Sequence, residues 1–429
     1  MKRTLASLAA LLAAGLTLVL PGARTDPGPS RPVATADASL VPGMHSAEAP
    51  HSTPVSGNRS PRWIRRLDGL VKGVPISVAV LDDGGSVYHF RPATPRVPAS
   101  NEKLLLSMAL LSALGPDERI PTTVSATNRS HGVVRGDLWL EGGGDPTITS
   151  GDLARLAHRI RAAGVQRIAG SVKASVEPFA HDWSAPGWKP KFRREQVALP
   201  TALTFEGNSI RGRHVRHPER FASASLLQHL RKVGVKVDGR AGTGHPPQST
   251  HEVASITSPP LLRILHQQNV DSINFFAEVL NKLLGYSSSA QEGTIAGGAA
   301  AIQSWAATEG VELEADDGSG LSYSNRVSAA GVVELLQAAD GTSWGVPLRN
   351  SLAHPGQGTL SGRLPGIKLH AKTGTLHIAS ALSGWIWLKR GRDWAPFSIL
   401  VGNIDTDRAI ALEDQIVRIL SKSARSPAA

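Results

Sequence analysis

The sequence predicts an α+β protein of more than one domain, in which one α+β domain is inserted into another. Its 429 residues exceed the length of one small module. Residues 61–119 combine a strand hairpin with a long apolar helix, and long helices and further strands return after residue 256. Residues 120–255 have a different pattern of predicted elements, with short strand-like pieces and two separate helical patterns. We therefore expect a split domain at 61–119 and 256–425 around an inserted domain at 120–255.

The N-terminus has the pattern of a secretory signal peptide. Lys2 and Arg3 precede an apolar run, Leu5–Leu20, and small residues follow at 21–23. A run of about 16 residues is short for a membrane span. We expect residues 1–23 to be a cleaved signal, with an uncleaved membrane anchor as the alternative, and 24–60 to be a flexible linker rich in Pro, Ser and Thr. Either interpretation places the rest of the chain outside the cytoplasm.

The composition excludes several kinds of chemistry and indicates what surrounds the protein. The chain has no cysteine, which excludes disulfides, a thiol nucleophile and thiolate metal sites. Lys and Arg number 46 against 35 Asp and Glu, a net charge of +11. That balance favours an anionic environment. For an exported chain we expect cell-wall polymers as that environment and no nucleic-acid partner.

The first part of the split domain begins with a helix and a hairpin. A turn at 82–85 joins the two strands, and Gly115-Pro116 ends the helix that follows. That helix is apolar on nearly every side, which predicts burial in the middle of a domain, and Ser100 stands where its N-cap belongs. The expected elements are a helix near 62–67, strands at 74–81 and 86–90, and a helix up to Leu114.

The later elements follow the same pattern of helices and strands. The long helix after residue 260 breaks near Asp271. The last helix has an apolar face that we expect to pack on a sheet, with a membrane-surface role as the alternative. The expected helices are 152–163, 222–234, 260–281, 299–308, 328–338 and 408–421, and the expected strands include 138–140, 170–172, 369–374, 380–387 and 397–401.

Ser100 and Lys103 are the first candidate pair for chemistry. Residues three apart on a helix lie on the same face. A serine hydroxyl becomes a good nucleophile only when a base takes its proton, and a lysine amine in an apolar site has its neutral form favoured. The pair predicts an activated serine, whereas a capping serine beside a solvent-directed lysine is the structural alternative.

Two further segments offer polar side chains. Ser272 and Asn274 precede a good helix start, where a helix cap is the structural alternative. Lys372, Thr373 and Thr375 lie on a predicted strand beside Gly374. Such a strand suits an anionic extended ligand, and a lysine-bearing edge strand is its alternative.

The chain contains three short motifs in a fixed order: S-x-x-K at 100–103, S-x-N at 272–274 and K-T-G at 372–374. Together they resemble the motif set of penicillin-binding proteins and serine β-lactamases. Three motifs in their expected secondary structures are far more specific than one. Stretches such as 140–147 and 317–322, and the long segment from Lys103 to Ser272, resemble D-alanyl-D-alanine carboxypeptidases/endopeptidases of the penicillin-binding protein 4 type. The resemblance covers about residues 62–422, nearly all of the chain after the expected linker.

The resemblance implies a fold and a catalytic set. The fold is a penicillin-binding/serine β-lactamase-like transpeptidase domain, an antiparallel sheet flanked by helices, with an inserted α+β domain. Ser100 would be the nucleophile and Lys103 the acceptor of its proton. Ser272 would relay a proton to the leaving amine, and Asn274 would orient Lys103 and hold the substrate amide.

The same resemblance implies the substrate-binding residues. Lys372, Thr373, Gly374 and Thr375 would bind the C-terminal carboxylate of a peptidoglycan stem peptide, and the backbone N–H groups of Ser100 and Thr375 would stabilise the oxyanion. The expected activity is a serine-type D-Ala-D-Ala carboxypeptidase, with D,D-endopeptidase activity as an extension and β-lactams as covalent inhibitors. A serine β-lactamase or esterase on the same scaffold and an inactive cell-wall-binding relative are the alternatives.

Two other segments invite a functional interpretation. Asp145 follows three glycines, and a tight turn is favoured there over a metal or phosphate loop. We expect no metal or organic cofactor, because the sequence contains no compact ligand set. The basic run 187–194, which includes aromatic residues, is expected to be a solvated loop, with contact to glycan or an anionic wall polymer as the alternative.

Overall fold

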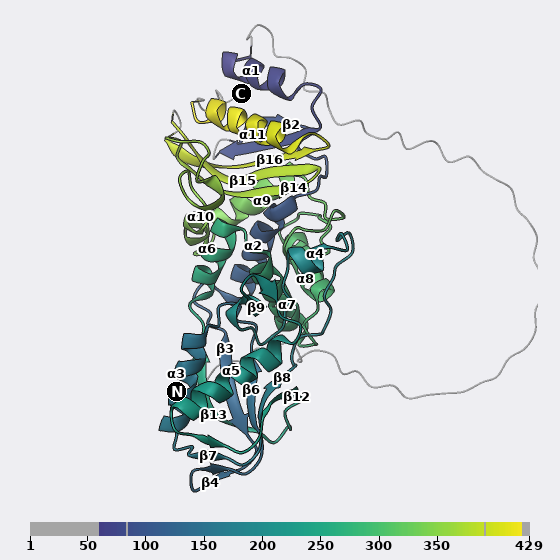
Figure 1. Ribbon diagram of the computed structural model, residues 1–429. Coiled ribbons are helices and arrows are strands. Elements are labelled where there is room, and N and C mark those ends of the chain that lie inside the picture. The colour runs from purple at the N-terminus through teal and green to yellow at the C-terminus, as the bar shows by residue number, and fades with distance from the viewer. Residues whose placement is uncertain (1–59, 83–84, 390–391, 423–429) are drawn as a thin grey trace, which may run out of the picture. The chain divides into compact units, whose positions relative to one another are not determined.

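The structure is a computed structural model that describes residues 60–82, 85–389 and 392–422 (Figure 1). The predicted signal peptide at 1–23 and the linker, apart from its last residue, lie outside the described residues. Within the described ranges, every helix is too short or too polar to cross a membrane.

One five-stranded antiparallel sheet combines the two ends of the described chain. β1 pairs with β16 along Ile76–Val80, so the N-terminal hairpin joins the C-terminal strands. β14 lies at one edge of the sheet, where the N–H of Ala371 donates to the carbonyl oxygen of Ala353 over 2.9 Å. The strands, in spatial order, are β14 (Leu369–Leu376), β15 (Ala379–Leu388), β16 (Asp393–Gly402), β1 (Ile76–Asp82) and β2 (Gly85–Phe90).

Helices cover both faces of this sheet, as the resemblance implies (Figure 1). One face packs on α1 (Arg62–Val71) and α11 (Thr406–Leu420), where Leu67, Ile399 and Ile416 share a buried cluster. The prediction that the last helix packs on a sheet is therefore confirmed. The other face packs on a larger cluster that contains α2 (Glu102–Leu114), which is buried from Glu102 to Leu111. The remaining helices of this part are α6 (Leu261–Asp271), α7 (Asn274–Ser289), α8 (Ile295–Thr308), α9 (Ala329–Asp340) and α10 (Gly345–Ser351).

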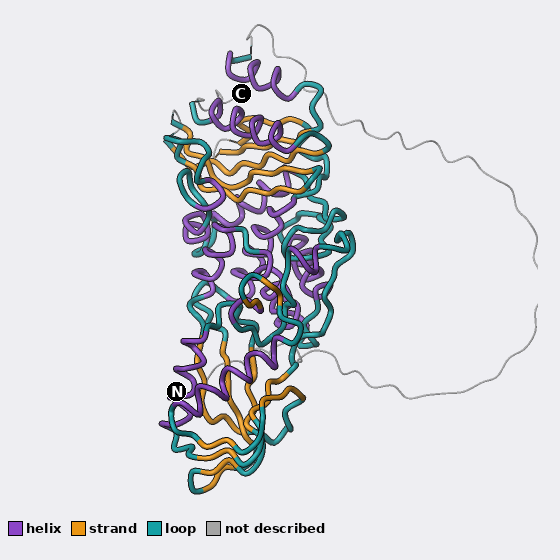
Figure 2. The backbone as a smooth tube through the Cα atoms, in the orientation of Figure 1, coloured by secondary structure: helices purple, strands orange, loops and turns teal. Residues whose placement is uncertain are grey.

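Residues 121–257 contain their own sheets and core. A mixed five-stranded sheet in the order β12-β8-β6-β3-β13 packs against α3 and α5, and in Figure 2 its strands lie apart from those of the first sheet. A four-stranded sheet and a two-stranded sheet complete it. The elements are β3 (Pro121–Ala126), β4 (Arg129–Ser130), β5 (Val133–Val134), β6 (Leu138–Gly142), α3 (Ser150–Ala162), β7 (Arg167–Ile168), β8 (Val172–Ser175), α4 (Phe192–Glu195), β9 (Ser209–Ile210), β10 (Arg213–His214), α5 (Pro218–Lys232), β11 (Lys236–Val237), β12 (Ala241–Gly244) and β13 (His251–Thr257).

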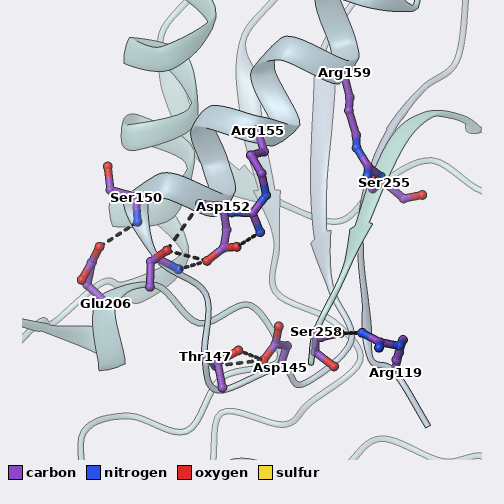
Figure 3. Close-up of polar contacts among 11 residues, drawn as sticks. Arg119, Asp145, Thr147, Ser150, Asp152, Arg155, Arg159, Glu206, Ser255 and Ser258 are labelled. Atoms are coloured by element: carbon purple, nitrogen blue, oxygen red, sulfur yellow. Dashed lines mark hydrogen bonds and ion pairs between the residues drawn. The ribbon is translucent and has the colours of Figure 1, made fainter. Parts of the chain in front are cut away.

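The chain enters and leaves this region at neighbouring points. The Nη1 of Arg119 donates to the carbonyl of Ser258 over 2.9 Å (Figure 3). The backbone N–H of Ile120 donates to the Oγ of Ser258 over 2.9 Å. Two backbone crossings held side by side are typical of a domain inserted within another.

One segment inside the region packs elsewhere. Phe179, Ala198 and Ala202 belong to the cluster of α2 and α7, not to the cluster of α3 and α5. The Nζ of Lys282 on α7 donates to the carbonyls of Ala180 and Asp182 over 2.8 and 3.0 Å. The segment between β8 and η2 (Glu206–Asn208) therefore contributes to the surroundings of α7.

Candidate active site

Ser100 lies in a 3-10 turn, η1 (Ala99–Asn101), that leads directly into α2. The prediction that Ser100 caps the helix is wrong, because Ser100 is inside the turn and Asn101 precedes α2. Ala99 has a φ of 47°, which redirects the chain just before Ser100. Gly320 must be a glycine, since a Cβ there would lie 1.8 Å from the carbonyl oxygen of Ala99. Close backbone packing thus fixes the turn and leaves Ser100 partly exposed.

Lys103 is fully buried directly behind Ser100. Its Nζ lies 3.1 Å from the Oγ of Ser100, 2.7 Å from the Oδ1 of Asn274 and 2.5 Å from the carbonyl oxygen of Ser319. Burial lowers the pKa of Lys103 to about 8, although nearby carboxylates oppose this shift. About one-tenth of this amine is therefore neutral at pH 7 and one-half at pH 8, and the neutral form is the one that accepts a proton.

The break between α6 and α7 supplies Ser272 and Asn274. Ser272 ends α6 in the left-handed conformation, with φ 56° and ψ 45°, and Asn274 is the first residue of α7. The break predicted near Asp271 is confirmed. The chain turns here so that both side chains reach the same cavity as Ser100.

Lys372 on β14 approaches the site from the sheet. Its Nζ lies 2.9 Å from the Oγ of Ser272 and 2.8 Å from the carbonyl oxygen of Thr373. Burial, and secondarily the charge of Lys103, lowers the pKa of Lys372 well below the usual value. A carboxylate bound beside this amine would favour its charged form.

The predicted site residues meet at one cavity of about 450 Å³. Ser100, Ser272, Asn274, Thr373 and Thr375 line it, whereas Lys103 and Lys372 lie buried behind that surface. Gly374 brings β14 against η1, since a Cβ there would lie 3.1 Å from the backbone nitrogen of Ser100. All eight predicted residues are thus brought together, and the volume falls in the ~300–1,000 Å³ range of ligand pockets.

Three buried acidic residues near Lys103 were absent from the predicted set. Glu102, Glu278 and Asp317 are each at most 1% exposed. The Oε1 of Glu278 accepts the N–H of Ser319 over 2.8 Å. Burial, with the charge of Asp317, raises the pKa of Glu278 to about 8. A glutamate inside the apolar helix at 102 was the available sequence signal, but the acids come from segments far apart in the chain.

Asp317 holds the loop that contacts Lys103. Its Oδ1 accepts the N–H of Gly320 over 2.9 Å, and its Oδ2 accepts the N–H of Ser322 over 2.9 Å. The N–H of Gly320 and the carbonyl of Ser319 belong to one peptide group. Asp317 therefore orients the peptide whose carbonyl accepts the Lys103 amine.

The basic run 187–194 is anchored, so its interpretation as a solvated loop is wrong for its aromatic residues. The Nε1 of Trp188 donates to Asp317 over 2.6 Å, and Phe192 is buried against Leu321 and Val197. Lys189, Lys191 and Phe192 line the same cavity as Ser100.

Asp145 closes a turn, as predicted. Its Oδ1 accepts the N–H of Thr147 over 2.9 Å and the hydroxyl of Thr147 over 2.7 Å (Figure 3). Among the residues that the structure describes, no group of three or more His, Asp or Glu side chains is placed to hold a metal ion.

The profile of the D-Ala-D-Ala carboxypeptidase 3 (S13) family matches residues 66–211 and 198–423. The chain belongs to this family. The chain is similar to a D-alanyl-D-alanine carboxypeptidase of an Actinomadura species, with 26% identity over 92% of this chain and 91% of the relative. It is also 27% identical to the carboxypeptidase DacB of Mycolicibacterium smegmatis, over 85% of this chain and 83% of the relative.

A solved structure shares the fold of this family member. Penicillin binding protein 4 from Haemophilus influenzae matches with a TM-score of 0.74 and 19% identity, over 83% of this chain and 99% of that chain. The α+β multidomain fold predicted from the sequence is confirmed. Family membership also confirms the predicted class of enzyme, a D-Ala-D-Ala peptidase.

Proposed function

We propose that this enzyme cleaves the bond between two terminal D-alanines of peptidoglycan stem peptides through an ester of Ser100. The Oγ of Ser100 attacks the carbonyl carbon and passes its proton to the neutral amine of Lys103. The observation that carries this proposal is the 3.1 Å contact between that Oγ and an amine whose pKa burial lowers to about 8. No other nucleophile is required.

The remaining steps use the other side chains of the cavity. Lys103 returns a proton through the Ser272 hydroxyl to the leaving amine, and D-alanine departs. Water then attacks the Ser100 ester and gives up a proton to Lys103. The bond between the acyl carbon and the Oγ of Ser100 breaks, Lys103 returns that proton to the Oγ, and the shortened peptide leaves as an acid that ionises to a new carboxylate. The Asn274 amide, which accepts from Lys103 over 2.7 Å, keeps that amine beside Ser100.

β14 would bind the C-terminal D-alanine end of the substrate. Beyond Ala371, which pairs with Ala353, the outer edge of this strand would pair with an extended peptide. The hydroxyls of Thr373 and Thr375 would donate to the C-terminal carboxylate, with Lys372 adding positive potential behind them. The backbone N–H groups of Ser100 and Thr375 would stabilise the oxyanion. Gly374 permits this arrangement because a side chain there would push β14 away from η1.

We also propose where the enzyme works and how it is divided. The basic and apolar N-terminal pattern supports export, and peptidoglycan peptides and β-lactams lie outside the cytoplasm. The separate core of residues 121–257, with the paired crossings at Arg119 and Ser258, supports the split domain at 61–119 and 256–425 and the inserted domain at 120–255. Anionic cell-wall polymers would account for the net charge of +11.

A labelled penicillin and a pentapeptide ending in D-Ala-D-Ala test the proposal together. We expect a long-lived penicillin ester on Ser100, located by peptide mass spectrometry, and release of D-alanine from the pentapeptide. Ser100→Ala should abolish both, whereas Ser112→Ala, an exposed serine near the other end of the same helix, should keep both. Rapid hydrolysis of the penicillin would instead indicate a β-lactamase. D-alanine release that survives Ser100→Ala would refute the assigned nucleophile.

A further inference from the structure

A buried glutamate on α11 has no part in the proposed reaction. Glu413 is fully buried on a helix face whose other members, such as Ala409, Ile416 and Leu420, are apolar. In Figure 1, α11 lies over the sheet that contains β15. Burying a carboxylate costs free energy, and apolar side chains of similar size often stabilise a protein at least as well as a buried ion pair. Stability therefore does not explain why a carboxylate stands at this position.

The two oxygens of Glu413 bind two segments that lie far apart from α11 and from each other in the chain. Oε1 accepts the hydroxyl of Ser380 over 2.6 Å. Oε2 accepts a hydrogen bond from the Nη2 of Arg363 over 2.8 Å. Arg363 also donates to Asp414, the next residue of α11. Glu413 therefore forms a bridge between Ser380 and Arg363.

Ser380 secures the strand that contains Thr375. The two residues are paired directly between β15 and β14. In the proposed reaction Thr375 supplies one N–H group to the oxyanion, and the turn that follows it, at His377 and Ile378, is exposed. Ser380 comes just after that turn and is itself buried. Its bond to Glu413 therefore restrains the hairpin close to the oxyanion N–H.

Arg363 secures a second wall of the cavity. Thr359, which lies in η3 (Gly358–Leu360), lines the cavity of the active site. Leu360 is buried in the same cluster as the apolar face of α11. The N–H of Arg363 donates to the carbonyl oxygen of Leu360 over 3.1 Å, so Arg363 directly continues this turn. The contact between Arg363 and Glu413 thus ties η3 to α11.

We propose that Glu413 is a positioning residue for the reaction at Ser100. By binding Ser380 and Arg363 at once, it keeps the walls formed by β14 and η3 at the separation that the transition state needs. Glu413 does not line the cavity, so it acts through these two partners. The inference rests on the proposed function, because the oxyanion role of the Thr375 N–H is part of that function.

Single and double variants test whether the bridge acts as a unit. Ser380→Ala removes one contact of Glu413, and Glu413→Gln removes the charge that faces Arg363. We expect each to lower kcat for D-alanine release from a pentapeptide ending in D-Ala-D-Ala about tenfold, with KM changed less than about threefold, because oxyanion contacts act in the transition state. The double variant should also lose about tenfold, since a bridge broken at one end loses little more when the other end is cut.

Each sample is corrected for its content of reactive enzyme. Labelling of Ser100 with a fluorescent penicillin to its end point counts the reactive molecules, and kcat is expressed per labelled site. Measurement at pH 8 keeps Glu413 mostly ionised, because burial raises the pKa of its carboxyl to about 7. Glu219→Gln is the matched control: it changes another buried glutamate, which pairs with His181 from α5, and should keep kcat per labelled site within about twofold.

The outcomes distinguish this inference from the proposed function. If the unchanged enzyme neither reacts with the penicillin nor releases D-alanine, the proposed function fails. If it is active, and either Ser380→Ala or Glu413→Gln keeps its kcat per labelled site, Glu413 has a structural role alone and the inference is refuted. A double variant whose loss is the product of the two single losses would also refute it, because the two contacts would then act independently.

Discussion

At the scale of single residues, we propose that the protonation of Lys103 controls when Ser100 can react. The amine is fully buried and accepts protons only when neutral. Burial favours the neutral form, while the negative charges of Asp317, Glu278 and Glu102 favour the charged form. The outcome is a pKa of about 8, close to the pH at which the enzyme would work.

The acylation rate should therefore rise with pH through about 8. Lys103 loses its proton as pH increases, so its neutral fraction grows from about one-tenth at pH 7 to one-half at pH 8. We expect the second-order rate of acylation by a fluorescent penicillin to increase about fivefold over that interval and to level off above about pH 9. Stopped-flow measurements from pH 6 to 9.5 would give the profile.

Lys372 supplies the control for this experiment. Its pKa is also lowered, so loss of its charge would weaken binding of the antibiotic's carboxylate at high pH. Lys372→Arg keeps a charge there and should remove such a decline. Because a charge at 372 disfavours the charged form of Lys103, the rise should persist but move to lower pH. A rate that does not change between pH 7 and 8 would mean that Lys103 is already neutral and would contradict the prediction.

At the scale of elements, the sequence predicted the motifs better than their surroundings. Helical spacing places Ser100 and Lys103 on one face, and apolar periodicity with turn residues locates β14 and the break before α7. The 3-10 geometry of η1 was not predictable, because it depends on Gly320 and Gly374 approaching from distant segments. The acids behind Lys103 were missed for the same reason: they are brought together only by folding.

The loop between α8 and α9 should control Lys103 through Asp317. Asp317→Asn places an amide donor where two backbone N–H groups need an acceptor, which should cost about 2–4 kcal/mol of stability. It should also reduce the plateau rate of acylation about tenfold, since the Ser319 carbonyl would no longer hold the amine firmly. Because the negative charge of Asp317 raises the pKa of Lys103, its removal should move the midpoint of the pH profile below 8.

Asp316→Asn is the matched control. Asp316 accepts from the hydroxyl of Ser322 but makes none of the contacts to the Gly320 peptide, so the midpoint should stay near 8. Thermal melts of both variants separate loss of fold from loss of function. A destabilised Asp317→Asn enzyme with an unchanged midpoint would show that Asp317 has a structural role alone.

At the scale of the whole molecule, the change in composition near residues 120 and 255 predicted where the expected inserted domain begins and ends. It did not predict that Phe179, Ala198 and Ala202 pack with α2 and α7. That segment is rich in Pro, Trp and basic residues and has no helical or strand periodicity, so its packing depends on surfaces supplied by α7 and the loop at 317. Lys189 and Lys191 reach the cavity of Ser100 because of this packing.

If residues 121–257 have an independent core, a cavity in that core should leave Ser100 working. Leu226 and Leu265 are both fully buried leucines, the first in the core of α3 and α5 and the second in the core of α2 and α7. Changing either to Ala should reduce the free energy of unfolding by about 2–5 kcal/mol.

Leu226→Ala should lower one calorimetric transition and keep the rate of penicillin acylation at 20 °C within about twofold, because distant sites rarely couple. Leu265→Ala should lower the other transition, which penicillin acylation raises in the unchanged enzyme. A single transition that both variants lower equally, or loss of acylation in Leu226→Ala, would mean that the two cores fold as one unit and that the chain is not divided as proposed.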